Sequence, residues 1–445
     1  MSNAAWWLLP VAVLLAVHGW GLAAWFQQDD FAWLGLVRDW SEGGSLGELL
    51  FRPSQHGTWR PLSERAYFLF FPAVFGWESW PMRVWAFLTQ AASLVLLQAI
   101  GLRLGLPRAV AVMAAVLWAA NAKISTAMIS NGAYVHVMGG FFLLLALWCS
   151  MTERWRAMWA AFLTGFFVME SNVVFPALAC AYWVWRGDRD KLRRVLWLWP
   201  VSLVYYALHM QFAPKLAEGS YAMHFDWGML RTFGRYLQWA FQADNLRALT
   251  GLPEVVNQIC GVLFPVVVLA LVGWRAWRRD LTPLLAMSWF GALLGPVLPL
   301  REHVTDYYLT VPLAGLCLLT AMVLRWRWGW ALLALYLLTQ APAAYKTTQW
   351  WQQRSLVAKD LVRQVWTVHK ANPGRLILLD GVTDEQFWAA LAHYPFVERG
   401  KTYVFLTPET RARIVPHPES GVRLEEFFLE EVPRDAVRFT VKGAP

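Results

Sequence analysis

The protein has 445 residues, of which 58% are apolar and only 16% are charged, and it contains 30 tryptophans. Soluble globular proteins average about 45 to 50% apolar and about 25% charged residues. The apolar excess excludes disorder, collagen and coiled coil, and it predicts a membrane protein, because only lipid lets so much apolar side chain lie outside a protein core. The net charge of +9 comes without a basic tail or a continuous basic face, so nucleic acid is not an expected partner.

Apolar runs of spanning length follow one another along the chain, if about 17 to 25 residues are allowed for each transmembrane helix. They lie at residues 5–26, 80–102, 107–122, 132–150, 156–170, 172–186, 195–212, 255–274, 281–300, 306–325 and 329–346. We therefore expect an α-helical polytopic membrane protein with about eleven transmembrane helices. No Lys or Arg precedes the first run, so it lacks the charged start of a cleaved signal peptide and is expected to persist as the first helix.

The connections between these runs alternate in charge. Clusters of basic residues occupy the connections at 103–108, 154–156, 186–194, 275–279 and 325–327. Cytoplasmic loops of membrane proteins are enriched in Lys and Arg, so these connections are expected on the cytoplasmic side. The opposite, outer side then receives residues 27–79, 121–131, 213–254 and 301–305, and the chain beyond Lys346.

The composition changes after Lys346. Residues 347–445 contain no apolar run of spanning length. Residues 375–380 and 401–406 have the pattern of buried strands, and residues 384–394 have that of a helix with an acidic first turn. We expect a small soluble α/β domain at 347–445 that follows a transmembrane domain at 1–346.

Asp29 and Asp30 directly follow the first apolar run, on the predicted outer side. Two adjacent carboxylates repel each other, and partial removal from water raises the pKa of at least one of them, as a general base requires. The structural alternative is an acidic helix end or an N-cap for the segment that begins near Phe31. We predict Asp29 and Asp30 as the catalytic residues, in the outer loop 27–79.

Other polar residues on the outer side are predicted to bind the substrate or its phosphate. Basic side chains of the first outer loop are suited to hold phosphate oxygens. The alternative, given equal weight, is that they pair with Asp29, Asp30 or Glu64. Glu170 interrupts two apolar runs, and an ionisable group at that depth is a functional candidate because its burial is costly. A lone His136 at a helix start is more often structural. The predicted set comprises His56, Arg60, Glu64, His136, Glu170, Arg301, His303, Asp306 and Tyr307.

A metal cofactor is not predicted. His303 and Asp306 fit one face of a helix and would suit a divalent metal, but two ligands are too few for a metal site. The sequence has no P-loop, no dinucleotide-binding glycine pattern and no His-Glu-x-x-His motif. Nucleotide hydrolysis, dinucleotide redox chemistry and zincin proteolysis therefore lose support.

The order of the polar segments resembles the GT-C superfamily of integral membrane glycosyltransferases. The resemblance rests on Asp29-Asp30-Phe31, on Arg60-Pro61-Leu62, on Glu170 with residues 172–176, and on residues 306–315. Within the superfamily the chain is similar to the protein O-mannosyltransferase-like and tetratricopeptide-linked transmembrane mannosyltransferases. It departs from them in having Met169 where a Lys commonly precedes the Glu, and in lacking a tetratricopeptide array after the membrane part.

The resemblance implies a hexosyltransferase-type enzyme that passes a sugar from a polyprenyl-phosphate carrier to an acceptor on the outer face. Asp29 or Asp30 would act as the base, and Arg60, Arg301 and His303 would neutralise the leaving phosphate. The expected location is the bacterial inner membrane, with membrane lipid around the protein and with the site and the C-terminal domain on the periplasmic side.

Two other functions are weighed against transfer. A transporter or flippase of lipid-linked glycans would need ionisable residues near the middle of the membrane and repeat symmetry, whereas the polar segments here cluster at one face. A non-catalytic assembly subunit is the third alternative. The residues do not specify the sugar or the acceptor.

Overall fold

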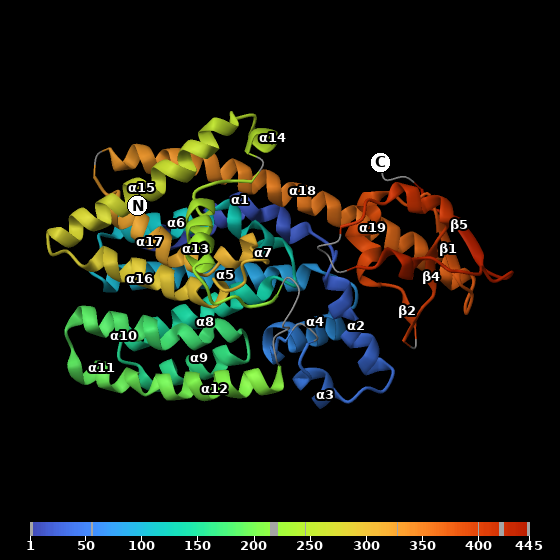
Figure 1. The fold of residues 1–445 in the computed structure, drawn as a ribbon, viewed down its shortest axis with the longest axis horizontal. Helices are drawn as coiled ribbons and strands as arrows, with labels where there is room; N and C mark the ends of the chain where they lie inside the picture. Colours follow the sequence, from blue (N-terminus) through green and yellow to red (C-terminus); the bar gives the residue numbers. More distant parts are fainter. Residues whose placement is uncertain are drawn as a thin grey trace.

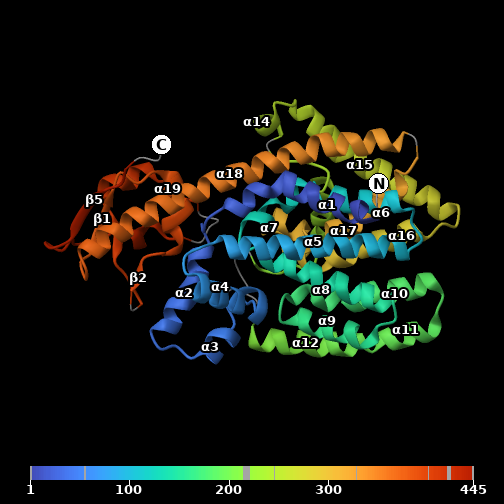
Figure 2. The same cartoon turned by 180° about the vertical axis from the view of Figure 1, so that it is seen from behind.

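The computed structural model describes residues 3–54, 57–213, 221–244, 246–326, 328–398, 400–417 and 422–442. The chain is mostly helical, with a small sheet region near the C-terminus (Figure 1). A large helical body holds most of the chain, and the α/β part lies at one end of it. The long helix α18 (Gly329–Ala371) runs through Lys346 without a break and joins the two (Figure 2).

Each predicted apolar run contains a helix. The main helices of the body before α18 are α1 (Asn3–His18), α5 (Trp80–Arg103), α6 (Arg108–Ala119), α8 (Tyr134–Met151), α9 (Trp155–Phe166), α10 (Phe175–Arg186), α11 (Arg189–Leu196), α12 (Leu198–Phe212), α13 (Gly228–Trp239), α15 (Glu254–Trp277), α16 (Thr282–Leu294) and α17 (Pro312–Val323). Short elements connect them: η1 (Gly19–Ala23), α2 (Asp30–Ser41), α3 (Leu46–Phe51), η2 (Pro61–Ala66), α4 (Tyr67–Phe75), η3 (Ala122–Ile124), α7 (Ser125–Ile129), η4 (Glu170–Val174), α14 (Leu246–Thr250), η5 (Gly295–Val297) and η6 (Asp306–Leu309).

The apolar helices make this an integral membrane protein. In the described residues, four helical segments are long and apolar enough to cross a membrane: Ala5–Ala23, Trp80–Arg103, Tyr134–Met151 and Glu254–Trp277. The pair Arg108–Ala119 and Ala122–Ile129, bent by 54°, would be a fifth span. The expected count of about eleven is not confirmed. Turns such as η4 interrupt several runs, so their regular helices are shorter than the runs themselves.

The predicted cytoplasmic connections gather at the end of the body opposite the α/β part (Figures 1 and 2). Arg103 Nε donates to the carbonyl oxygen of Met151 at 3.2 Å. Lys191 Nζ lies 2.5 Å from Glu153 Oε1. These two contacts bring the connections at 103–108 and 186–194 to the residues just before the connection at 154–156, so basic clusters that are separate along the chain lie near one another in space.

The α/β part is built on a three-stranded parallel sheet with the order β4-β1-β5. The apolar strand β1 (Ile377–Asp380) lies in the centre, and Ile377 pairs with Val404 of β4 (Val404–Leu406) and with Val437 of β5 (Val437–Thr440). The strands β2 (Val397–Glu398) and β3 (Lys401–Thr402) form a short hairpin. The strand expected at 375–380 is present, and the one expected at 401–406 is divided between β3 and β4.

A helix also forms where the acidic turn predicts one. Thr383 and Gln386 form a capping box that starts α19 (Asp384–Ala390), and η7 (Leu391–His393) extends it. The short helices η8 (Pro408–Arg413) and η10 (Leu424–Phe427) complete this part. The α19–η7 end contacts the helical body near α2, which places the α/β part beside the first outer loop.

Candidate functional site

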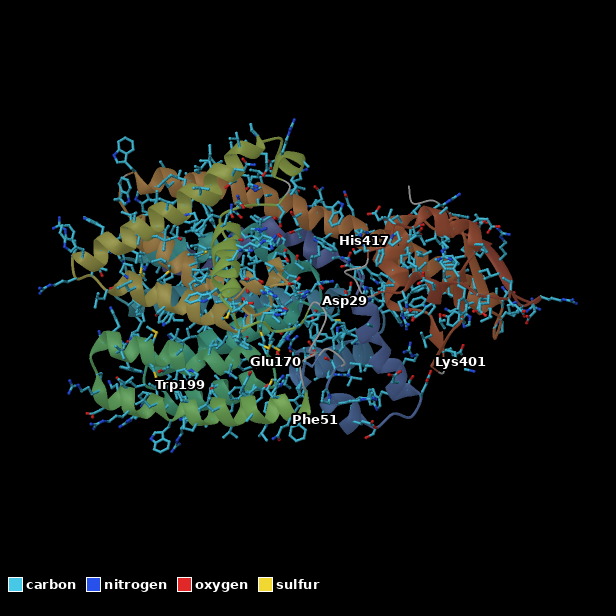
Figure 3. All side chains as sticks on the ribbon, in the orientation of Figure 1. Asp29, Phe51, Glu170, Trp199, Lys401 and His417 are labelled. Carbon is cyan, nitrogen blue, oxygen red and sulfur yellow. The ribbon has the colours of Figure 1, made fainter. Side chains whose placement is uncertain are left out.

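The predicted catalytic pair lies where the helical body meets the α/β part. Figure 3 shows Asp29 at this junction and Glu170 on the side of the body. The turn η1 continues the first apolar helix, and α2 begins at Asp30, so both carboxylates project from the point where the chain leaves the body.

Asp30 is fully buried. Its Oδ2 accepts from the backbone N–H of Gln27 at 3.3 Å and from Asn131 Nδ2 at 3.2 Å, and its Oδ1 accepts from the backbone N–H of Gly132 at 3.1 Å. Arg83 Nη2 lies 3.6 Å from Oδ2. Burial raises the pKa of Asp30 to about 6, against the opposite effect of Arg83. Asp30 therefore ties the first outer loop to α5 and to the segment before α8.

Asp29 has the opposite environment, because its side chain is 69% exposed. It occupies the N-cap position of α2, and Asp30 follows in the first turn, so the acidic helix end of the structural alternative is present, although the Asp29 side chain makes no capping hydrogen bond. Its Oδ1 lies 3.3 Å from Nε2 of His393. The backbone N–H of the preceding Gln28 donates to the carbonyl oxygen of Ala389 at 2.9 Å. Asp29 is thus an accessible carboxylate fixed between the two parts of the molecule.

Arg60, Glu64 and Glu170 form one ion-paired group. Arg60 Nε donates to Glu170 Oε2 at 2.8 Å, and Arg60 Nη1 donates to Glu64 Oε1 at 2.6 Å. Burial raises the pKa of Glu64, whereas the positive charge of Arg60 lowers it. Arg60 is therefore paired with acids, which is one of the two roles considered for the basic residues of this loop. The pairing also fixes the direction of its guanidinium group.

A cluster of phenol and imidazole rings lies beside this group. His303 Nε2 and the Tyr307 hydroxyl are 3.1 Å apart. The ring centroids of Tyr221 and His303 are 4.2 Å apart, and His136 lies 5.0 Å from Tyr307 and 5.5 Å from Tyr308. The cluster joins residues from α8, η6 and the segments before α13 and η6, and it offers several hydrogen-bond donors and acceptors to one ligand.

The charges of Asp29 and Arg60 influence the ring cluster through Tyr221. The pKa of Tyr221 is raised by burial and by Asp29, and is lowered by Arg60. Asp29, Arg60 and the ring cluster therefore border one region, although they come from distant segments of the chain.

Three other predicted residues either pair with partners outside the ring cluster or lie outside the described chain. Arg301 pairs with Asp226 at 2.6 Å and is 41% exposed. Asp306 accepts a hydrogen bond from the Thr126 hydroxyl at 2.8 Å. His56 lies outside the described residues.

The described residues contain no group of three or more His, Cys, Asp or Glu side chains placed to hold a metal ion. His303 faces Tyr307, whereas Asp306 faces Thr126, so the two side chains do not converge as metal ligands would.

Sequence reasoning missed Arg83, Tyr221 and His393. Arg83 is a single charge near the start of the apolar run 80–102, which is the same feature that identified Glu170, and it could have been found in that way. Tyr221 and His393 carry no such local pattern. Their place in the site depends on contacts between segments that are far apart in sequence.

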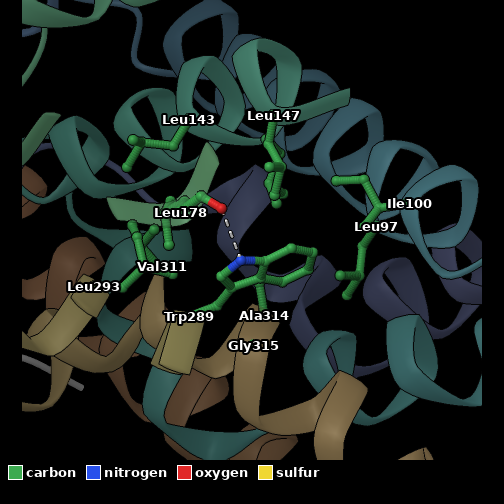
Figure 4. A pocket seen from close by; sticks show the side chains of 11 residues that line it. Leu97, Ile100, Leu143, Leu147, Leu178, Trp289, Leu293, Val311, Ala314 and Gly315 are labelled. Carbon is green, nitrogen blue, oxygen red and sulfur yellow. Dashed lines mark hydrogen bonds between the residues drawn. The ribbon is translucent and has the colours of Figure 1, made fainter. Parts of the chain in front are cut away.

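The enclosed space within the helical body is not a substrate site. Figure 4 shows an apolar cavity between α5, α8, α10, α16 and α17, where Trp289 Nε1 donates to the carbonyl oxygen of Leu178 at 3.1 Å. Its volume is about 20 Å³, close to that of a single water molecule. A sugar or a prenyl chain does not fit in this cavity.

No family model matches the chain, and no curated protein matches it. Two solved structures are similar, those of ArnT from Cupriavidus metallidurans bound to undecaprenyl phosphate and in the apo state. The first is 12% identical over 94% of this chain and 91% of that chain, and the second is 14% identical over 95% and 91%, each with a TM-score of 0.49. At these values, the similarity assigns neither an activity nor a substrate to this chain.

Proposed function

We propose that the protein is an integral membrane glycosyltransferase that moves a sugar from a polyprenyl-phosphate carrier to an acceptor, with Asp29 as the general base. The observation that carries the proposal is the exposed carboxylate of Asp29 at the junction, together with the ion-paired Arg60 group, whose charge and that of Asp29 both act on Tyr221 of the ring cluster. A carboxylate, a fixed cation and several hydrogen-bond donors are what the transfer of a sugar from a lipid phosphate requires.

In the proposed step, the acceptor oxygen or nitrogen forms a bond to C1 of the sugar and inverts that carbon. The bond between C1 and the phosphate oxygen breaks, and the phosphate leaves with the electron pair. Asp29 takes the proton of the acceptor. Asp30 has both oxygens occupied, so its proposed role is to hold the Asp29 segment in place.

The leaving phosphate needs positive charge near it. We propose that Arg60 and His303 face the phosphate and that Arg301 lies at the rim. Glu64 and Glu170 would hold the guanidinium group of Arg60 in one direction, so that little side-chain conformational entropy is lost when the phosphate binds. His136 and Tyr307 would contact the sugar from the same cluster.

The proposed arrangement in the membrane follows the charged connections. Residues 1–346 would form the transmembrane domain, with the shorter apolar helices also in the lipid, and residues 347–445 would form an extracytoplasmic domain. The contacts of Arg103 and Lys191 support one cationic end opposite the α/β part. The proposed location is the bacterial inner membrane, with the site on the periplasmic side.

Carrier release tests this function. Membranes that contain the protein are incubated with polyprenyl-phosphate carriers that bear labelled sugars, and membranes without the protein serve as the control. We expect at least one carrier to lose its sugar and to yield an equal amount of polyprenyl phosphate. Movement of intact carriers across vesicle bilayers, without loss of sugar from any of them, would favour a flippase instead.

A further inference from the structure

We propose that His393, from the C-terminal α/β part, is a positioning residue of the transferase site that orients the carboxylate of Asp29. This inference rests on the proposed function and deepens it, because it makes the α/β part a component of the site. The acceptor would then meet a base that exists in its working orientation only when the two parts are in contact.

Two adjacent links connect the base to the α/β part. His393 ends η7, and its Nε2 lies 3.3 Å from Asp29 Oδ1. The backbone N–H of Gln28 donates to the carbonyl oxygen of Ala389, the next-to-last residue of α19, at 2.9 Å. One link holds the backbone before Asp29 and the other contacts its side chain, so together they restrict the direction of the carboxylate.

The backbone on both sides of this contact is in the left-handed region. Gln28 has φ 50° and Tyr394 has φ 52°, and neither is a glycine. Non-glycine residues adopt this conformation infrequently, and such residues concentrate at functional sites, where the surrounding structure holds them in place. Gln28 precedes Asp29, and Tyr394 follows His393, so each residue of the pair is held by a constrained neighbour.

The charges around His393 favour a neutral imidazole. Burial lowers the pKa of His393, Asp29 raises it, and Arg354 of α18 lowers it again. Asp384 and Glu385 of α19 act on Arg354 in turn. A neutral imidazole with its proton on Nε2 donates toward Oδ1 of Asp29, which leaves Oδ2 for the proton of the acceptor.

The contact is accessible to an acceptor. The side chain of His393 is 25% exposed and that of Asp29 is 69% exposed, so the pair lies at the surface of the junction between the two parts. A large acceptor can therefore reach Asp29 without entering the helical body.

The experiment compares His393→Ala with His369→Ala in the carrier-release assay. His369 is a matched control because it lies near the same part of the molecule, stacks on Tyr403 with centroids 4.1 Å apart, and has Nε2 3.6 Å from Glu398. We expect His393→Ala to lower kcat by roughly tenfold to a hundredfold, with KM for the carrier changed less than about twofold. His369→Ala should leave both constants near the wild-type values.

Further readouts separate positioning from mere structure. His393→Asn, which keeps an N–H donor, should recover part of kcat and should be assayed as well in case the alanine variant does not fold. In Asp29→Asn, the additional His393→Ala change should cause no further loss.

The failures are distinguishable. If the wild-type protein transfers sugar and both His393 variants behave like His369→Ala, this inference is overturned and the proposed function stands. Losses of kcat that simply multiply in the double variant also overturn it. If the wild-type protein transfers no sugar from any carrier, the proposed function fails, and the role of His393 fails with it.

Discussion

Asp29 and Asp30 are adjacent in the chain, but their carboxylates lie in opposite environments. Asp30 is fully buried and accepts three hydrogen bonds, whereas Asp29 is largely exposed beside His393. The first turn of α2 separates the two side chains, since successive residues of a helix point in different directions. A general base must contact its substrate, so we assign the catalytic role to Asp29 and a structural role to Asp30.

Asp30→Ala should therefore destabilise the protein much more than Asp29→Ala. The first change leaves Arg83 buried without its carboxylate, and loss of one partner of a buried pair costs about 3 to 5 kcal/mol. The second removes an exposed group and should change the free energy of unfolding by about 0.5 kcal/mol or less. Thermal unfolding in detergent measures both variants. Equal destabilisation by the two changes would contradict the division of roles.

The raised pKa of Asp30 predicts a pH dependence of stability. Its pKa rises from 3.8 in the unfolded chain to about 6 in the folded protein, chiefly through burial. The folded state therefore favours the protonated form of Asp30. Its contribution to the free energy of unfolding is fully present below about pH 4 and is lost as the pH rises to about 6, a loss on the order of 3 kcal/mol in total. In Asp30→Asn the slope between these pH values should flatten. An unchanged slope in that variant would assign the effect to other groups.

At the scale of elements, the close approach of η1 to α7 sets the position from which the catalytic loop starts. A Cβ at Gly21 would lie 2.8 Å from the backbone oxygen of Met128, whereas a Cβ at Gly19 would meet nothing within 4 Å. Both glycines belong to η1, eight to eleven residues before Asp29 and Asp30. The short elements after the first helix are thus held by packing, which hydrophobic periodicity does not reveal.

Gly21→Ala should lower stability by about 1 to 3 kcal/mol, because backbone atoms have to move apart. It should also lower transfer activity, since η1 leads directly to Asp29. Gly19→Ala is the matched control and should be nearly neutral in both measurements. If the two variants have the same melting temperature and activity, the contact with Met128 does not constrain the loop.

The elements also show what the sequence could and could not predict. The apolar runs located the helices, and the pattern of residues 375–394 predicted β1 and the helix after it, because both depend on local periodicity. The number of spans is not confirmed, since turns within runs such as the one at Glu170 shorten the regular helices. Asp29, Arg60 and Glu170 were predicted as site residues from charge near apolar runs. His393 was not, because only tertiary contact brings η7 to Asp29.

At the scale of the whole molecule, the proposed membrane topology requires a cationic end of the helical body opposite the α/β part. The contacts at Arg103 and Lys191 gather the basic connections, and α18 carries the chain from the body to the opposite end. From the positive-inside rule, we propose that the α/β part and Asp29 lie on the outer side.

Cysteine labelling tests this orientation. Arg189 in α11 and Glu430 near the C-terminus are both exposed, so each can be replaced by cysteine without disturbing a core. A membrane-impermeant maleimide applied to spheroplasts should label Glu430→Cys and should label Arg189→Cys only after lysis. The wild-type protein, with Cys149, Cys260 and Cys317 buried, gives the background. The reverse pattern would place the proposed site in the cytoplasm.

The most direct test is the release of polyprenyl phosphate by Asp29→Asn compared with Asp39→Asn. Asp39 is an exposed acid on α2 that pairs with Arg38 at 3.4 Å, so the control removes the same charge from the same loop. The account predicts that Asp29→Asn inserts normally into the membrane and loses activity by a factor on the order of 10² to 10⁴. Asp39→Asn should retain wild-type activity. Full activity in Asp29→Asn would contradict the assignment of Asp29 as the base.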